Sequence, residues 1–132
     1  MSEQTKVLLV DDDADFVEST SALLEAHNYS VISAYDGKAG FQKAQDETPD
    51  LLLLDVMMST KTEGFDVARQ IARHEELKNM PVILLTGIRN DMNLPYGFEP
   101  DEEWLPVYTV MEKPVQPDKL INTIEELLRR QA

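Results

Sequence analysis

Three short, unbroken aliphatic runs constrain the fold of this chain more than any other feature of its sequence. They read Val7-Leu8-Leu9-Val10, Leu51-Leu52-Leu53-Leu54 and Val82-Ile83-Leu84-Leu85, and a polar residue follows each run. An apolar run of about four residues without alternation is typical of a strand that is covered on both faces. Two weaker strands are predicted at 30–34 and 107–111.

Between these strands, apolar side chains recur at helical spacing. The helical stretches lie at 16–27, 37–46, 65–72 and 120–128. Alternation of strand and helix implies parallel strands joined by right-handed crossovers, with helices on both faces of one sheet. We therefore predict an α/β fold with a doubly wound, five-stranded parallel sheet, formed by one domain spanning residues 1–132.

Charge and composition exclude several classes of protein. The formal net charge of -13 repels phosphate backbones and anionic lipid, so we expect no direct binding of nucleic acid or membranes. No apolar run approaches the roughly 20 residues of a membrane span, and the N-terminus lacks a signal sequence, which predicts a cytoplasmic protein. The absence of cysteine removes disulfides and thiolate metal sites.

Carboxylates gather where the predicted strands end. Asp11, Asp12 and Asp13 follow the first strand, and Asp55 follows the third. If these strands are adjacent, their acids meet at the edge of the sheet where such folds bind ligands, and a cation would relieve their repulsion. Oxygen ligands without histidine or cysteine favour Mg²⁺ over zinc or copper. Asp13 also fits the N-cap of the helix that follows it.

Two further strand ends carry groups that suit a phosphate. Thr86 offers a hydroxyl and Gly87 leaves room for a bulky anion, while Lys113 offers a mobile positive charge. Each pair alone has an ordinary alternative: Thr86 bonding its own backbone, and Lys113 as a solvated surface charge. Four such strand ends in sequence order favour a shared site.

Together these segments resemble the receiver domains of two-component signalling. The resemblance rests on Val7-Leu8-Leu9-Val10-Asp11-Asp12, Leu53-Leu54-Asp55-Val56-Met57-Met58 with Gly64-Phe65, Leu84-Leu85-Thr86-Gly87 and Glu112-Lys113-Pro114. It implies a flavodoxin-like sheet with strand order 2-1-3-4-5. It also implies that Asp12, Asp55 and the main-chain carbonyl of Met57 coordinate Mg²⁺, with Asp11 acting through water.

The resemblance further implies a phosphorylation switch rather than an enzyme. Asp55 would accept a phosphoryl group from a sensor histidine kinase or phosphotransfer protein, and hydrolysis would later reset it. Thr86 and Lys113 would bind the phosphoryl oxygens, and the Lys113-Pro114 peptide is expected to be cis. We expect a stand-alone regulator, monomeric or weakly dimeric, that acts on a downstream protein whose identity the sequence does not give.

The sequence departs from the family pattern in three places. Ser59 stands where proline is usual, in a loop that is one residue longer. The segment 87–106 contains three prolines, which predicts a fourth helix that is short or replaced by loop, with Tyr96, Phe98 and Trp104 as possible docking anchors. Val110 stands where relatives often carry a switching aromatic residue, and Tyr108 is offset by two.

Two alternatives remain open at this stage. A haloacid-dehalogenase-like phosphohydrolase would use Asp11 as nucleophile and Asp13 as acid, but this length leaves no room for a cap domain and later strands lack paired acids. A degenerate receiver would serve only as a protein-binding module, but the chain retains the acidic pair, the acceptor and the lysine.

Overall fold

The computed structural model describes residues 4–55, 63–87, 109–113 and 115–131. Within these ranges strand and helix alternate as predicted, except that the last two strands follow one another in the order of described elements. The elements are β1 Lys6–Val10, α1 Ala14–Ala26, β2 Ser30–Ala34, α2 Gly37–Glu47, β3 Leu51–Asp55, α3 Glu63–Arg73, β4 Val82–Gly87, β5 Thr109–Lys113 and α4 Pro117–Gln131.

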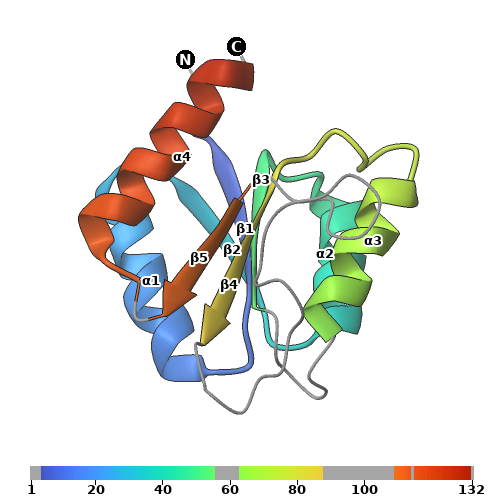
Figure 1. Ribbon diagram of the computed structural model, residues 1–132, viewed down its shortest axis with the longest axis horizontal. Helices are drawn as coiled ribbons and strands as arrows, with labels where there is room; N and C mark the ends of the chain where they lie inside the picture. The colour runs from blue at the N-terminus through green and yellow to red at the C-terminus, as the bar shows by residue number, and fades with distance from the viewer. Residues whose placement is uncertain (1–3, 56–62, 88–108, 114, 132) are drawn as a thin grey trace.

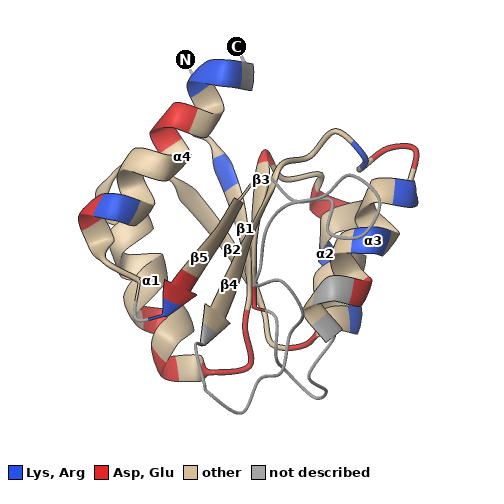
Figure 2. Ribbon diagram, viewed as in Figure 1, with Lys and Arg blue, Asp and Glu red and all other residues tan. Residues whose placement is uncertain are grey.

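The five strands form one parallel sheet in the order β2-β1-β3-β4-β5, which confirms the predicted topology (Figure 1). In the register, Val10 lies beside Ala34 on one side and Leu54 on the other. Because all strands run the same way, their carboxyl ends meet at a single edge of the sheet. Acidic segments lie along that edge, where the strand arrows end (Figure 2).

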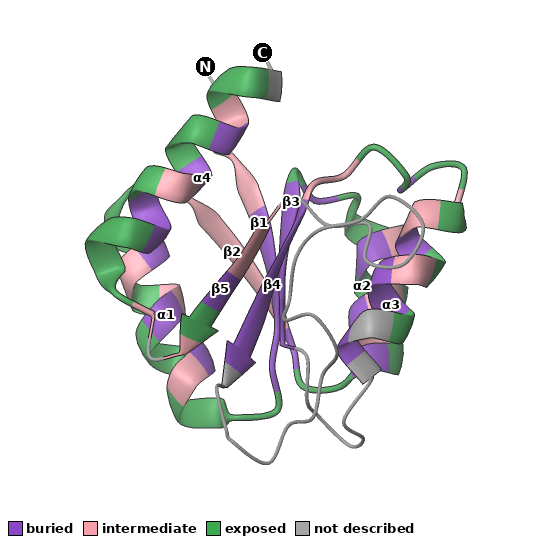
Figure 3. Ribbon diagram, viewed as in Figure 1, coloured by how far each residue is buried: buried purple, intermediate pink, exposed green. Residues whose placement is uncertain are grey.

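Helices cover both faces of the sheet. Helices α1 and α4 lie on one face, and α2 and α3 lie on the other (Figure 1). Successive residues of the aliphatic runs point to opposite faces: Leu8 and Leu52 join the core under α2 and α3, while Leu9 and Leu53 join the core under α1 and α4. Both faces are therefore buried, which explains why the runs are continuous (Figure 3).

Local side-chain chemistry sets the ends of the first two helices. Asp13 caps α1 by accepting hydrogen bonds from the backbone N–H groups of Asp15 and Phe16, as predicted. Asp36 caps α2 in the same way through the N–H of Ala39. Helix α2 ends at Glu47, and its C-cap Thr48 has a left-handed backbone with φ of 42° just before Pro49.

The structure corrects some details of the sequence interpretation. The last strand continues to Lys113 rather than ending at residue 111, so the lysine belongs to the strand itself. In α1, Thr20 and Leu24 of the predicted stretch are buried together with Val17, whereas His27 is exposed, because the helix ends at Ala26 and His27 is its C-cap.

Several predictions lie outside the described residues. They concern the loop at Ser59, the segment 88–108 with its fourth helix and aromatic anchors, the Met57 carbonyl and the Lys113-Pro114 peptide. The helix labelled α4 is the C-terminal helix predicted at 120–128 and does not test the prediction for the segment after β4. Among the described residues no helix is long and apolar enough to cross a membrane.

Candidate functional site

The carboxylates of Asp11, Asp12 and Asp55 converge at the carboxyl edge of the sheet. Each offers an oxygen that lies within 4.8 Å of the others. The register explains this proximity, because Val10 pairs with Leu54 and the next residue in each neighbouring strand segment is an aspartate. Asp11 is 0% exposed and Asp55 is 4% exposed, whereas Asp12 faces solvent.

Lys113 reaches this cluster from β5, two strands away from β3. Its Nζ lies 2.5 Å from Oδ2 of Asp11 and 3.5 Å from Oδ1 of Asp55. The lysine side chain is 21% exposed, and the Nζ also lies 4.4 Å from the centre of the Phe16 ring. The alternative interpretation of Lys113 as a solvated surface charge is therefore wrong.

Asp11 is held by the protein on both carboxylate oxygens. Oδ1 accepts a hydrogen bond from the backbone N–H of Asp13 at 2.9 Å, and Oδ2 accepts from Lys113. Its own N–H donates to the carbonyl of Ala34 at 3.1 Å. Buried charges persist in proteins when they are paired and hydrogen-bonded in this way. Sequence reasoning did not predict this direct contact with Lys113.

Thr86 is buried at the end of β4 with its hydroxyl unsatisfied. The residue is 1% exposed, and its Oγ1 has no hydrogen-bond partner among the described residues. The alternative that Thr86 bonds its own backbone is therefore wrong. A buried hydroxyl without a partner costs about 1–3 kcal/mol, and such groups are rare in native proteins unless a ligand or water completes them.

The acidic cluster has the ligand chemistry of a hard divalent cation. Three carboxylates offer oxygen ligands, and no histidine belongs to the group found in the described ranges. Magnesium is commonly bound by one or two carboxylates together with waters and phosphate oxygens. Asp13 does not join the cluster, because its carboxylate caps α1.

The model of the response regulator receiver domain family matches residues 7–125 of this chain. The chain belongs to this family. Family members are signalling domains of two-component systems, and they bind Mg²⁺ at an acidic pocket; this chain has the corresponding fold and an acidic cluster at the carboxyl edge. The receiver fold is consistent with a phosphoacceptor switch and favours neither the phosphohydrolase nor the degenerate-receiver alternative.

Three relatives illustrate the match. The chain is 34% identical to the transcriptional regulatory protein ResD of Bacillus subtilis over 98% of this chain and 50% of ResD. It is 29% identical to PilH of Pseudomonas aeruginosa over 93% of this chain and 97% of PilH. A CheY-like receiver domain protein from Methanospirillum hungatei superposes with a TM-score of 0.81 at 26% identity, over 98% and 97% of the two chains.

The chain spans about half the length of the first curated relatives it matches. PilH, by contrast, is matched over nearly its whole length. The match therefore identifies this chain as a receiver domain. It does not assign to this chain the functions of the longer relatives.

One residue of the site was not predicted from the sequence. Phe16 was interpreted only as part of the apolar stripe of α1, yet its ring lies beside the ammonium of Lys113. The available signal was its position three residues after the N-cap Asp13, which places it in the first helical turn next to the acidic edge.

Proposed function

We propose that the whole chain, residues 1–132, is one receiver domain that carries its phosphoryl group on Asp55. The observation that supports this most is the convergence of Asp55, Lys113 and two further carboxylates at one edge of the sheet. Asp55 lies near both the acids that follow β1 and the ammonium at the end of β5. It is buried and ends β3, whose other residues are all buried leucines.

The proposed metal ligands are the carboxylates of Asp12 and Asp55 and the main-chain carbonyl of Met57, with Asp11 acting through water. When bound, Mg²⁺ would neutralise charge on the phosphoryl oxygens and lower the barrier to attack by a carboxylate. The oxygen-only ligand set and the closeness of three negative charges support this assignment.

In the phosphotransfer step, a carboxylate oxygen of Asp55 forms a bond to phosphorus. The P–N bond of a phosphohistidine on the donor protein breaks at the same time, and the imidazole takes up a proton and leaves neutral. Lys113 pairs with one phosphoryl oxygen, and the unsatisfied hydroxyl of Thr86 donates a hydrogen bond to another.

Hydrolysis returns the switch to its resting state. Water attacks phosphorus, the bond to Asp55 breaks, and inorganic phosphate leaves. While it is present, the phosphoryl group carries a charge of roughly -1.5 to -2, which draws Thr86 and Lys113 inward and biases the surface toward a downstream protein. The donor is a sensor histidine kinase or phosphotransfer protein, and the domain acts in the cytoplasm as a monomer or weak dimer.

The domain is proposed to act on a protein rather than on nucleic acid. Relatives such as ResD are named as transcriptional regulators, but this chain spans only half of ResD. A net charge of -13 opposes contact between the receiver domain itself and a phosphate backbone.

A labelling experiment tests the proposal. The protein is incubated with Mg²⁺ and a small acyl phosphate, and incorporated phosphoryl is measured on intact protein by mass spectrometry. We expect one phosphoryl group on the natural chain, none on Asp55→Asn, and normal labelling of the matched variant Asp13→Asn, because Asp13 is committed to capping α1.

The same experiment separates the alternatives. Labelling that persists in Asp55→Asn and disappears in Asp11→Asn would identify a hydrolase that uses Asp11 as nucleophile. A natural chain that takes up no phosphoryl group with Mg²⁺ would identify a degenerate receiver. Either result would overturn the assignment to Asp55.

A further inference from the structure

The ammonium of Lys113 lies close both to two carboxylates and to an aromatic ring. Its Nζ lies 2.5 Å from Asp11, 3.5 Å from Asp55 and 4.4 Å from the centre of the Phe16 ring. Lysine has a flexible stem of four carbons, so two carboxylates on one side do not fix its position. A cation over an aromatic face is attracted by the ring quadrupole, and the attraction grows as water is removed.

Phe16 is itself fixed by the site that it contacts. Oδ1 of Asp11 accepts from the N–H of Asp13, and Oδ1 of Asp13 accepts from the N–H of Phe16. Lys113 connects the two ends of this series, because its ammonium contacts the Phe16 ring and donates to Oδ2 of Asp11. These four residues therefore form a closed ring of interactions that links the start of α1 to the end of β5.

We infer that Phe16 is a positioning residue for phosphotransfer, acting through Lys113. Its ring holds the ammonium within reach of Asp55 and limits its escape to solvent. The ammonium is then already close to the oxygens of a phosphoryl group arriving on Asp55, so little rearrangement is needed in the transition state. This inference rests on the proposed phosphoacceptor role of Asp55.

The ordinary alternative is that Phe16 contributes only apolar surface to the core under α1 and α4, against which it packs half-buried. The two roles differ in their dependence on ring electrostatics. Core packing depends on volume and apolar area, whereas the contact with Lys113 depends on the negative potential of the ring face.

Fluorination separates the two roles. Mono-, di- and trifluorinated phenylalanine is incorporated at position 16 of the full chain, which weakens the ring quadrupole stepwise with little change of shape. The rate of phosphorylation by a small acyl phosphate is measured at saturating Mg²⁺, together with the melting temperature. We expect the rate to fall with each added fluorine, reaching about fivefold in Phe16→Leu, while the melting temperature of the fluorinated series stays constant.

The chain offers a matched control and a rescue. Phe41 is a half-buried phenylalanine on the opposite face that packs against His74, and the same fluorinated series there is expected to leave the rate unchanged. Phe16→Tyr retains an aromatic face and is expected to keep a rate close to that of the natural chain, whereas Phe16→Leu does not.

A spectroscopic signal tests the contact independently of phosphorylation. The methylene protons next to Nζ of Lys113 are expected to show an upfield ring-current shift in NMR spectra, and Phe16→Leu is expected to abolish it. A rate that is flat across the fluorinated series, with a labelled natural chain, would overturn the role of Phe16 and leave Asp55 as acceptor. Absence of labelling in the natural chain would instead contradict the proposed function.

Discussion

The middle of the central strands and their carboxyl ends are built on opposite principles. Residues 51–54 of β3 are all leucine and all buried, with cores packed on both faces. One residue later the strand places the buried carboxylate of Asp55 beside Asp11. Burial of apolar surface stabilises the fold, whereas burial of like charges opposes it. Stability is therefore concentrated in the strand interiors, whereas the strand ends carry a cost that Lys113 offsets in part and a bound cation would offset further.

The largest effect is expected from a substitution inside the core. Leu53→Ala should lower the free energy of unfolding by about 2–5 kcal/mol, because Leu53 is fully buried and its loss leaves a cavity. Asp55→Asn, two residues further along the same strand, should lower it far less in the absence of metal, since it weakens the contact with Lys113 but also removes one of three neighbouring negative charges. Urea denaturation followed by circular dichroism compares the two. An equal loss of unfolding free energy in both variants would contradict the difference between the interior of the strand and its carboxyl end.

A second substitution tests how tightly the core is packed next to the site. A Cβ added at Gly40 of α2 would lie 2.7 Å and 2.9 Å from the two γ carbons of Val10, the residue before Asp11. Gly40→Ala should therefore cost about 1–3 kcal/mol of overpacking, offset in part by a helix propensity gain of about 1 kcal/mol.

A double-mutant cycle isolates that clash. In a Val10→Ala background the two γ carbons are gone and only the Cβ at 3.4 Å remains, so Gly40→Ala should become neutral or stabilising. The melting temperatures of the natural chain, the two single variants and the double variant give the coupling between positions 10 and 40. An equal loss of melting temperature from Gly40→Ala in both backgrounds would show that the backbone shifts to accommodate the added methyl group. Packing against α2 would then not determine the position of Val10, the residue before Asp11.

Asp12 gives a smaller effect of opposite sign. Asp12→Ala should raise the free energy of unfolding by less than about 1 kcal/mol without metal, because the residue is exposed but lies in a cluster of three carboxylates. With Mg²⁺ the natural chain should be more stable than Asp12→Ala, since a ligand that binds the native state stabilises it. Glu18→Ala removes one exposed charge elsewhere on α1 and serves as the control. A lower melting temperature for metal-free Asp12→Ala would contradict a crowded acidic site.

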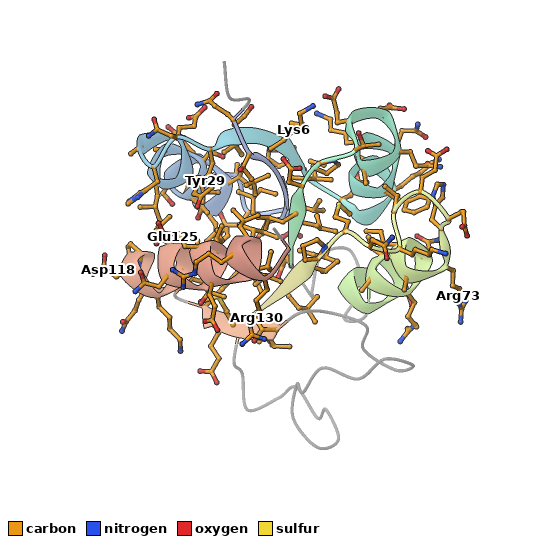
Figure 4. The ribbon with its side chains drawn as sticks, turned by 90° about the horizontal axis from the view of Figure 1, so that it is seen from above. Lys6, Tyr29, Arg73, Asp118, Glu125 and Arg130 are labelled. Atoms are coloured by element: carbon orange, nitrogen blue, oxygen red, sulfur yellow. The ribbon has the colours of Figure 1, made fainter. Side chains whose placement is uncertain are left out.

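The smallest effect concerns the opposite end of the sheet, where Tyr29 precedes β2 and lies beside α4, the helix that carries Glu125 (Figure 4). Burial, and secondarily the negative charge of Glu125, raise the pKa of Tyr29 above its ordinary value of 10.0. The unfolded chain therefore releases this proton at lower pH than the folded chain, and its contribution to stability is complete below about pH 10 and lost as pH rises above it.

Melting temperatures measured against pH check this effect. Tyr29→Phe should flatten the alkaline decline, and Glu125→Gln should flatten it only in part, because burial is the larger cause. Identical alkaline profiles for Tyr29→Phe and the natural chain would contradict a raised pKa of Tyr29 in the folded protein.

Most of the fold could be predicted because each of its elements leaves a periodic signal. Continuous runs such as Leu51 to Leu54 indicate strands covered on both faces, and alternation with helices fixes a parallel sheet. Strand order came from the family resemblance, since periodicity alone does not say which strands are neighbours. The end of the last strand was predicted at 111 rather than at Lys113 because its burial is only partial and its apolar signal is weak.

The site was predictable only as far as strand ends define it. Parallel strands bring Asp11, Asp55 and Thr86 to one edge of the sheet, and the strand order implied by the family resemblance makes the strands before Asp11 and Asp55 neighbours. The reach of Lys113 across two strands to Asp11 depends on rotamers, and the contact of its ammonium with Phe16 depends on how α1 packs. The sequence places Phe16 in the first turn of α1, near the acidic edge, but it does not give either contact.

The most direct test of the central claim is to locate the phosphoryl group on the chain. The natural protein is phosphorylated with a small acyl phosphate and Mg²⁺. Borohydride then reduces the aspartyl phosphate formed on the chain, and peptide mass spectrometry identifies the reduced residue. The account predicts modification at Asp55 alone, at the point where the β1 acids and Lys113 meet. Modification at Asp11, Asp12 or Asp13 with an unmodified Asp55 would contradict it.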